Sequence, residues 1–224
     1  MRNISDLKNS DISIQKKIDS FSKNLKKESF FLLIKPPKNI YKNSIDKNHI
    51  EEKIESLIKE GFINIEISWS DNENWLDFVS KLKLKFPKLY LGSASVINKK
   101  SIDDSIKIGL KYSMMKGWDR DLLNYSNSKN HLLIPGIKHL KDLKQAIDLN
   151  CKIIKIYPVK DNVELINISQ YKNINFIAAG GLSISDIPLY KSLGYKAIVI
   201  GDKGCKNNEI DPRIYAWLKK YRTK

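Results

Sequence analysis

Eight short apolar segments recur along the chain, separated by stretches whose apolar residues lie three or four positions apart. Short apolar runs are typical of buried parallel strands, and the spacing between them is that of amphipathic helices. The runs are Phe30–Ile34, Phe62–Ile67, Leu89–Leu91, Leu110–Met115, Leu132–Ile134, Ile153–Tyr157, Ile174–Ala178 and Ala197–Ile200. Eight strand-helix units within 224 residues predict an α/β fold, a compact (β/α)8 TIM barrel, with a doubly wound open sheet as the alternative.

The periodicity is weakest at the fourth strand and at the sixth helix, which is expected around residues 163–168. Ahead of the first strand, apolar residues recur at helical spacing. They are Ile14, Ile18, Phe21 and Leu25. We therefore expect residues 1–28 to form an N-terminal amphipathic helical extension covering one end of the barrel, and residues 29–224 to form a single barrel domain. A helix on a membrane surface is the less favoured alternative, because the apolar face is narrow and the polar face mixes acidic residues with lysine.

The chain is strongly basic, with 40 Lys and Arg residues against 25 Asp and Glu residues and a formal charge of +15. Such a charge prompts a nucleic-acid hypothesis, but phosphate and base recognition favours the guanidinium fork. Only four cations are arginine: Arg2, Arg120, Arg213 and Arg222. Because the lysines are scattered, we expect no nucleic-acid partner, whereas an anionic small-molecule substrate is compatible with this charge.

Other sequence features indicate where the chain works and which cofactors it needs. No apolar run approaches the roughly 18 residues of a membrane span, and the first residues lack the apolar core of a secretory signal. Two cysteines are too few for a disulfide framework. These features favour a cytoplasmic protein with no membrane partner. The isolated histidines His49, His131 and His139 suggest no metal site, and surface or helix-capping roles are expected for them.

Two strands carry a charged residue where alternation turns the side chain into the barrel. In residues 62–68 the isoleucines share one face, so Glu66 points inward with Asn64 and Ser68. In residues 152–158 the same alternation turns Lys155 inward between Ile153 and Tyr157. Both charges are thus predicted to face one interior.

An inward-facing lysine and glutamate can carry chemistry. Burial lowers the pKa of a lysine, and the neutral amine can attack a carbonyl to form a Schiff base. Glu66 could then transfer protons. The alternative is a buried Glu66–Lys155 ion pair that only fills space, although such pairs are weak stabilisers.

Two loops near the end of the chain are candidates for binding an anion. Gly180 and Gly181 follow the seventh apolar run and precede a helix, so bare amides there could cradle an oxyanion, although a tight turn is the commoner reason for such a pair. After the last strand, Lys203 would attract an anion and Asp202 would repel it. Barrels often bind phosphate with these two loops.

From about residue 28 to the end, the chain resembles the class I 2-keto-3-deoxy-6-phosphogluconate (KDPG) and 4-hydroxy-2-oxoglutarate (KHG) aldolases. The segments that carry the resemblance are Leu133-Ile134-Pro135-Gly136-Ile137, Ile154-Lys155-Ile156-Tyr157-Pro158, Ile65-Glu66-Ile67-Ser68, Gly92-Ser93-Ala94-Ser95 and Ala179-Gly180-Gly181. They look like the family's Pro-Gly element, its Lys-x-Phe-Pro strand, and its Glu-(Ile/Val)-Thr, Gly-Ala-Gly-Thr and Thr-Gly-Gly segments. The resemblance implies that Lys155 is the Schiff-base lysine and Glu66 the general acid/base.

The resemblance also implies a substrate-binding set, in part altered. Ser95 keeps a hydroxyl where the family contacts the pyruvyl carboxylate, the two glycines hold phosphate, and Lys35 stands at a first-strand position where some members have arginine. The set is Lys35, Ser95, Pro135, Gly180, Gly181 and Lys203. The departures from the family pattern are Ser70 for arginine, Met115-Lys116 for Ser-Pro, Ala179 for threonine and Gly201-Asp202-Lys203 for Gly-Gly-Ser. The catalytic pair is therefore retained better than the substrate clamp.

The implied function is a Schiff-base aldolase that cleaves a 2-keto-4-hydroxy acid, such as KDPG or 4-hydroxy-2-oxoglutarate, to pyruvate and an aldehyde. The resemblance implies no cofactor and a homotrimer. Two other hypotheses are a phosphate-binding barrel isomerase or synthase, in which Lys155 only lines the pocket, and a non-catalytic barrel that binds a metabolite, a partner or nucleic acid.

Overall fold

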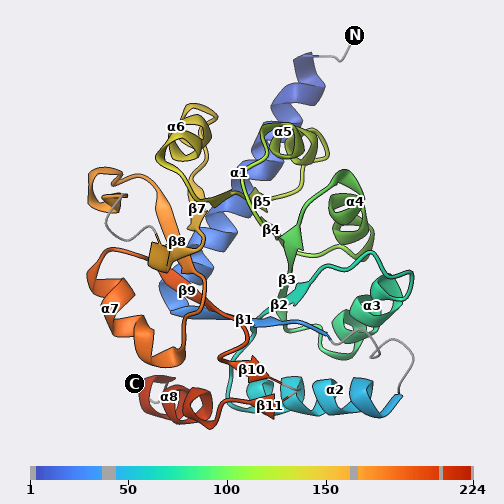
Figure 1. Ribbon diagram of the computed structural model, residues 1–224. Coiled ribbons are helices and arrows are strands. Elements are labelled where there is room, and N and C mark those ends of the chain that lie inside the picture. The colour runs from blue at the N-terminus through green and yellow to red at the C-terminus, as the bar shows by residue number, and fades with distance from the viewer. Residues whose placement is uncertain (1–3, 37–43, 162–165, 207–208, 223–224) are drawn as a thin grey trace.

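Parallel strands form a barrel ringed by helices in the computed structural model of the chain (Figure 1). The structure describes residues 4–36, 44–161, 166–206 and 209–222. The strands of the barrel are β1 Phe30–Ile34, β2 Asn64–Ser68, β3 Tyr90–Val96, β4 Ser113–Met115, β5 Leu133–Ile134, β6 Gly136–Ile137, β7 Ile153–Ile156, β8 Asn175–Ala179 and β9 Ala197–Ile200. They neighbour one another in the order β5-β4-β3-β2-β1-β9-β8-β7-β6. Because β5 and β6 are consecutive pieces of one strand on either side of Pro135, the sheet closes on itself, and the predicted (β/α)8 barrel is confirmed.

The break in the fifth strand follows from its sequence. Pro135 has no amide hydrogen to donate to the ladder, but its carbonyl accepts a hydrogen bond of 3.0 Å from the amide of Lys155. A Cβ atom on the next residue, Gly136, would lie 2.8 Å from the carbonyl oxygen of Met115. Glycine therefore lets the end of β4 approach the fifth strand closely.

The connecting helices lie outside the barrel (Figure 1). They are α2 Ser44–Lys59, α3 Trp75–Lys85, α4 Lys99–Ile108, α5 Arg120–Ser128, α6 Leu140–Asp148, α7 Ile187–Ser192 and α8 Pro212–Arg222. Local signals fix their ends: α4, for example, begins with a capping box between Asn98 and Ser101 and ends at Gly109, whose φ of 73° is left-handed. A small hairpin of β10 Cys205–Lys206 and β11 Glu209–Ile210 follows the last barrel strand.

The first half of the sixth helix expected around residues 163–168, residues 163–165, lies outside the described part of the chain. The described parts of this connection hold two short 3-10 helices, η1 Val159–Asp161 and η2 Ile168–Gln170, and a third, η3 Ile184–Asp186, precedes α7.

The N-terminal helix α1, Ile4–Lys27, packs against the amino-terminal ends of the strands. Its apolar residues Ile14, Ile18, Phe21 and Leu25 join the cluster inside the barrel. The ring of Phe21 lies 5.4 Å from that of Phe31, stacked, and 4.7 Å from that of Tyr112, edge to face. The expected helical extension over one end of the barrel is therefore confirmed. No helix among the described residues is both long and apolar enough to span a bilayer.

Candidate active site

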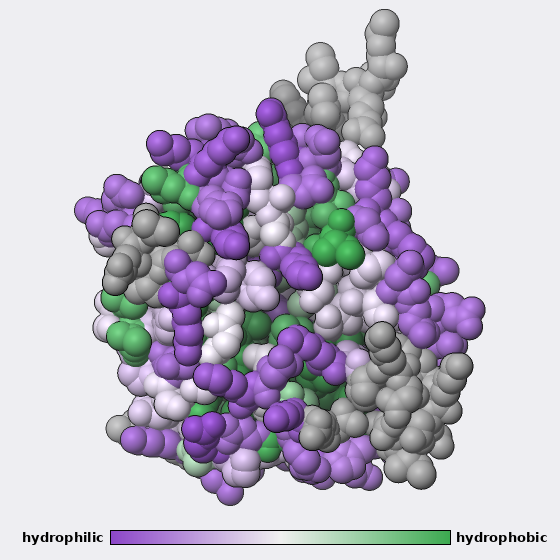
Figure 2. Space-filling model, viewed as in Figure 1, coloured by the Kyte–Doolittle hydropathy of each residue, from purple (hydrophilic) through white to green (hydrophobic). Residues whose placement is uncertain are grey.

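A cavity of about 940 Å³ opens at the carboxyl ends of the strands, opposite α1. Seen down the barrel, this face is hollowed near its centre, with apolar surface at depth and hydrophilic side chains around the rim (Figure 2). The cavity brings together seven of the eight residues expected from the sequence: Lys35, Glu66, Ser95, Lys155, Gly180, Gly181 and Lys203. The eighth, Pro135, lines a different pocket, near α1, because it lies within the fifth strand rather than at the strand's end. Pro135 is connected to the site by the hydrogen bond that its carbonyl accepts from the backbone amide of Lys155.

Lys155 points into the barrel from the middle of β7 and is 6% exposed. Its neighbours Ile154 and Ile156 face the helices, as the alternation of the strand requires. Its amine donates a hydrogen bond to the carbonyl of Met115 and lies 5.6 Å from the centre of the Tyr157 ring. Burial lowers the pKa of Lys155 to about 8, and the nearby charge of Glu66 opposes that shift. The neutral amine is thus easier to reach near neutral pH than in an exposed lysine.

Glu66 faces the same cavity from β2 and is 1% exposed. Burial raises its pKa to about 7, against the opposing influence of the Lys155 charge and of the Tyr112 hydroxyl. Glu66 and Lys155, which both lie in the described part of the chain, form no ion pair within 4.0 Å. The Lys155 amine donates to the carbonyl of Met115 instead. Among the described atoms, Oε1 of Glu66 has no hydrogen-bond partner. The charges of Glu66 and Lys155 therefore shift each other's pKa, but the two side chains do not form the space-filling salt bridge that was the alternative.

Sequence reasoning missed Tyr112, which lies under Glu66. In the sheet Glu66 is paired with Gly92, and a Cβ atom on Gly92 would come within 2.4 Å of the Tyr112 ring. The missing side chain at Gly92 therefore makes the space for Tyr112. Its hydroxyl lowers the pKa of Glu66, although neither this hydroxyl nor Oε1 of Glu66 has a hydrogen-bond partner of ordinary geometry among the described residues. Burial and the Glu66 charge in turn raise the pKa of Tyr112, so the phenol stays protonated. The sequence did contain a signal for this contact: a tyrosine at the start of a weakly predicted strand and a glycine on the adjacent strand.

Ser95 reaches the cavity through an irregular backbone. The pairing between β3 and β4 shifts register between Ser93 and Val96, and Ser95 has a left-handed φ of 60°. Its hydroxyl accepts a hydrogen bond of 2.9 Å from Ser68. Non-glycine residues adopt this conformation at a cost, and such strain is concentrated at functional sites.

The Gly180–Gly181 pair makes the turn after β8 with positive φ at both residues, 113° and 63°. Gly180 packs against Pro158, where an added Cβ would lie 2.9 Å from the backbone. Among the described residues, the amides of Gly181 and Leu182 donate to no acceptor. The turn thus provides free backbone donors at the rim of the cavity, as an anion site requires.

The loop after β9 contains an ion pair that the sequence did not reveal. Lys35, at the end of β1, lies 2.8 Å from the carboxylate of Asp202, with half or more of each side chain exposed. Asp202 is therefore compensated by Lys35, and within the described ranges Lys203 on the same rim forms no ion pair that would compete with an anion.

The comparisons with known proteins agree with this geometry. Residues 41–216 match the family model described as KDPG and KHG aldolase. Over 152 residues the chain is 26% identical to 2-dehydro-3-deoxy-phosphogluconate aldolase of Pseudoalteromonas atlantica, covering 66% of this chain and 70% of that relative. Over 114 residues it is 23% identical to the Zymomonas mobilis protein of the same name, covering 49% of this chain and 55% of that relative.

Solved structures give the same answer for the fold. The crystal structure of 2-keto-3-deoxy-6-phosphogluconate aldolase from Zymomonas mobilis superimposes with a TM-score of 0.71 at 18% identity, covering 88% of this chain and 93% of that one. A thiamine phosphate pyrophosphorylase from Pyrococcus furiosus, 11% identical, gives a lower TM-score of 0.57 over 88% of this chain and 96% of that one. Since the family model matches well over half of the sequence, the chain belongs to the KDPG and KHG aldolase family.

Proposed function

We propose that the protein is a Schiff-base aldolase that cleaves a 2-keto-4-hydroxy acid to pyruvate and an aldehyde. The observation that carries this proposal is the placement of Lys155 and Glu66: both are buried, both face one cavity at the catalytic end of the barrel, and they are not locked together. Desolvation lowers the pKa of the lysine and so favours the neutral form that a nucleophile needs.

In the proposed reaction, the neutral amine of Lys155 attacks the C2 ketone of the substrate. Glu66, directly or through water, transfers protons while the carbinolamine forms and loses water to give the iminium ion. Removal of the proton from the C4 hydroxyl breaks the C3–C4 bond, with the electron pair passing to the iminium. The aldehyde leaves, and the remaining enamine is protonated at C3 and hydrolysed to pyruvate, which regenerates the amine.

The residues at the rim of the cavity are suited to a substrate with an anionic group at each end. Ser95 carries a hydroxyl suited to the pyruvyl carboxylate, and the amides at Gly181 and Leu182 with Lys203 suit a phosphate. KDPG and 4-hydroxy-2-oxoglutarate are the proposed substrates, and a homotrimer is inferred from the resemblance alone.

The first experiment incubates the protein with pyruvate and sodium borohydride and maps the modified peptide by mass spectrometry. The expected result is one adduct, pyruvate less water plus two hydrogens, on Lys155. Screening glyceraldehyde 3-phosphate and glyoxylate as partner aldehydes then separates the two proposed substrates. A folded protein that gives no adduct would contradict the proposal and favour a barrel of another function.

Tyr112 provides a test of how Glu66 is tuned. Tyr112→Phe keeps the ring and removes only the hydroxyl that lowers the pKa of Glu66. Glu66 must be ionised to accept a proton as the amine attacks, so the acidic limb of the kcat/KM profile should move to higher pH. Activity should therefore fall below pH 7 and approach that of the wild type in alkaline solution. An acidic limb that stays in place or moves to lower pH would contradict this role.

Ser95 provides a test of carboxylate binding. In Ser95→Gly the relief of left-handed strain and the added flexibility of glycine nearly offset each other, so the free energy of unfolding should change by less than about 1 kcal/mol. Loss of a hydrogen bond to a charged group should raise the KM for the keto acid by about tenfold. Thermal unfolding and steady-state kinetics measure the two effects, and an unchanged KM would show that Ser95 does not contact the substrate.

A further inference from the structure

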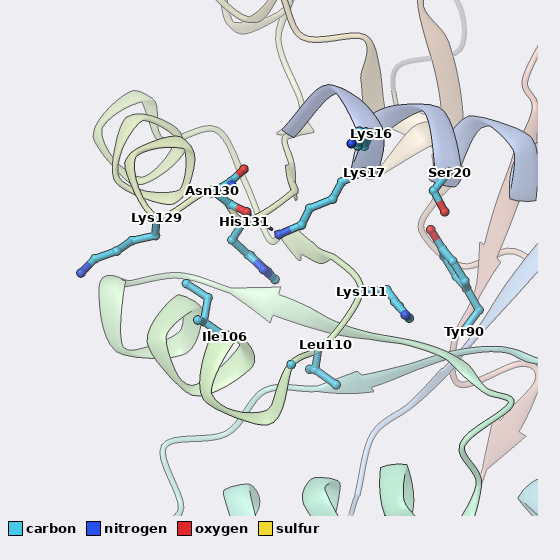
Figure 3. A pocket seen from close by; sticks show the side chains of 11 residues that line it. Lys16, Lys17, Ser20, Tyr90, Ile106, Leu110, Lys111, Lys129, Asn130 and His131 are labelled. Carbon is cyan, nitrogen blue, oxygen red and sulfur yellow. Dashed lines mark hydrogen bonds between the residues drawn. The ribbon is translucent and has the colours of Figure 1, made fainter. Parts of the chain in front are cut away.

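A second pocket, of about 440 Å³, lies at the amino-terminal end of the barrel, away from the candidate active site. It lies between α1, the start of β3, the α4–β4 turn and the α5–β5 turn (Figure 3). Four lysines line it: Lys16, Lys17, Lys111 and Lys129. The described lining includes no aspartate or glutamate, whereas the cavity at the other end mixes lysines with four carboxylates, Glu66, Asp71, Asp161 and Asp202.

The cations of this pocket are not neutralised by the described part of the protein. Elsewhere Lys35, Lys53 and Lys100 each pair with a carboxylate. No such pair is formed within the described residues by any of the four pocket lysines, and Lys17 instead donates to the carbonyl of Asn130. Burial lowers the pKa of Lys17, which shows that its charge is partly desolvated. A desolvated cation without a carboxylate favours an anion from outside.

His131 lies next to Lys17 in this pocket and is 2% exposed, which corrects the surface or capping role expected for it. A chain of hydroxyl groups fixes its hydrogen bond. Ser105 donates to the carbonyl of Ser101, so Ser93 must donate to Ser105 and Ser113 to Ser93. The Nε2 atom of His131 is then left to donate to Ser113, at 2.7 Å.

His131 is uncharged at neutral pH, so it does not alter the charge of the pocket. Burial, together with the charge of Lys17, lowers the pKa of His131 to about 4. An anion bound beside it would offset the Lys17 charge and raise that pKa, because an opposite charge favours the protonated imidazole.

The rest of the wall supplies neutral donors and a small apolar surface. The hydroxyls of Ser20 and Tyr90 point toward each other at one side of the pocket (Figure 3). Burial raises the pKa of Tyr90 to about 12, so its phenol remains a donor. Ile106 and Leu110 provide apolar contacts. Figure 3 shows the Lys129 amine directed away from the centre, so Lys17 and Lys111 are the central cations.

From these observations we propose that the pocket between α1 and the barrel binds a small oxyanion of the phosphate class, held by Lys17 and Lys111 with help from the Ser20 and Tyr90 hydroxyls. This site is separate from the turn at Gly180 and Gly181 that is proposed to hold the substrate phosphate, and its occupation does not depend on turnover.

The test titrates the full chain with inorganic phosphate at constant ionic strength and follows the His131 ring resonances by NMR. We expect saturable shifts and a higher pKa for His131 when phosphate is bound. The Lys17→Met/Lys111→Met variant should weaken this binding by about tenfold or more, because charge-assisted hydrogen bonds are lost. The matched control, Lys203→Met at the opposite rim, should leave the His131 response unchanged.

Two outcomes would overturn the proposal: a His131 resonance that does not respond to phosphate in the folded wild type, or a response that disappears in Lys203→Met and persists in the double variant. A thermal unfolding curve for each variant verifies that it is folded. Comparing inorganic phosphate with glycerol 3-phosphate identifies the source of the anion: tighter binding of the ester indicates a phosphorylated metabolite, and equal or weaker binding indicates the free ion.

Discussion

Lys155→Met should form no reducible adduct with pyruvate and should lose about 10³-fold or more in kcat for keto-acid cleavage. Methionine fills a volume similar to that of the lysine stem but has no nucleophile, so the iminium ion that accepts the electrons from the C3–C4 bond is never made. Removing one member of the buried pair also leaves Glu66 without its opposing charge. We therefore expect the carboxyl of Glu66 in this variant to be protonated to a higher pH than in the wild type.

The matched control is Lys152→Met, three residues earlier and outside the cavity. It removes the same charge from the same segment and should retain both the adduct and turnover. Borohydride trapping, a cleavage assay coupled to pyruvate detection and thermal unfolding complete the comparison. If Lys155→Met still forms the adduct while folded, another residue is the nucleophile and the proposed mechanism is wrong.

Glu66→Gln should lower kcat by about 10² to 10⁴-fold, the usual range for losing a general acid/base. The amide occupies the same space but cannot exchange a proton with the carbinolamine. Because the Glu66 charge raises the pKa of Lys155, its removal should lower the pKa of that lysine further. The amine is then neutral over a wider pH range, and adduct formation should be slow without being abolished.

Stopped-flow trapping separates these effects by giving the rate of adduct formation apart from its final amount. Normal turnover in Glu66→Gln would show that another group or water moves the protons.

The Lys155→Met/Glu66→Gln variant completes a double-mutant cycle. With both buried charges removed, its melting temperature should equal or exceed that of the wild type, because replacing such a pair by neutral groups is often stabilising. A large loss of stability in the double variant would instead favour a structural role for the pair.

The barrel could be predicted from the sequence because most of the strands and helices have their own local period. The inward positions of Glu66 and Lys155 likewise follow from isoleucines at alternate positions. The helix over the barrel end was readable from four apolar residues, and they lie in the interior cluster.

Features that depend on distant parts of the chain were not predictable in this way. The ion pair between Lys35 and Asp202 joins the ends of the first and last strands. The burial of His131 depends on serines from β3, β4 and α4, which no local pattern connects. Tyr112 acquires its role only because Gly92, on another strand, leaves room for its ring. In each case the missing information was a contact between elements, whereas sequence periodicity reports only which face of one element is buried.

The position of β1 has a consequence for how the chain acquires its chemistry during synthesis. β1 pairs on one side with β2 and on the other with β9, where Phe30 lies opposite Ile198. The barrel therefore cannot close until β9 has been synthesised, and such distant pairings are slow to form. The burial that shifts the pKa values of Glu66 and Lys155 belongs to the closed barrel. The pairing of β1 with β9 is thus also the step that encloses these two side chains and removes them from water.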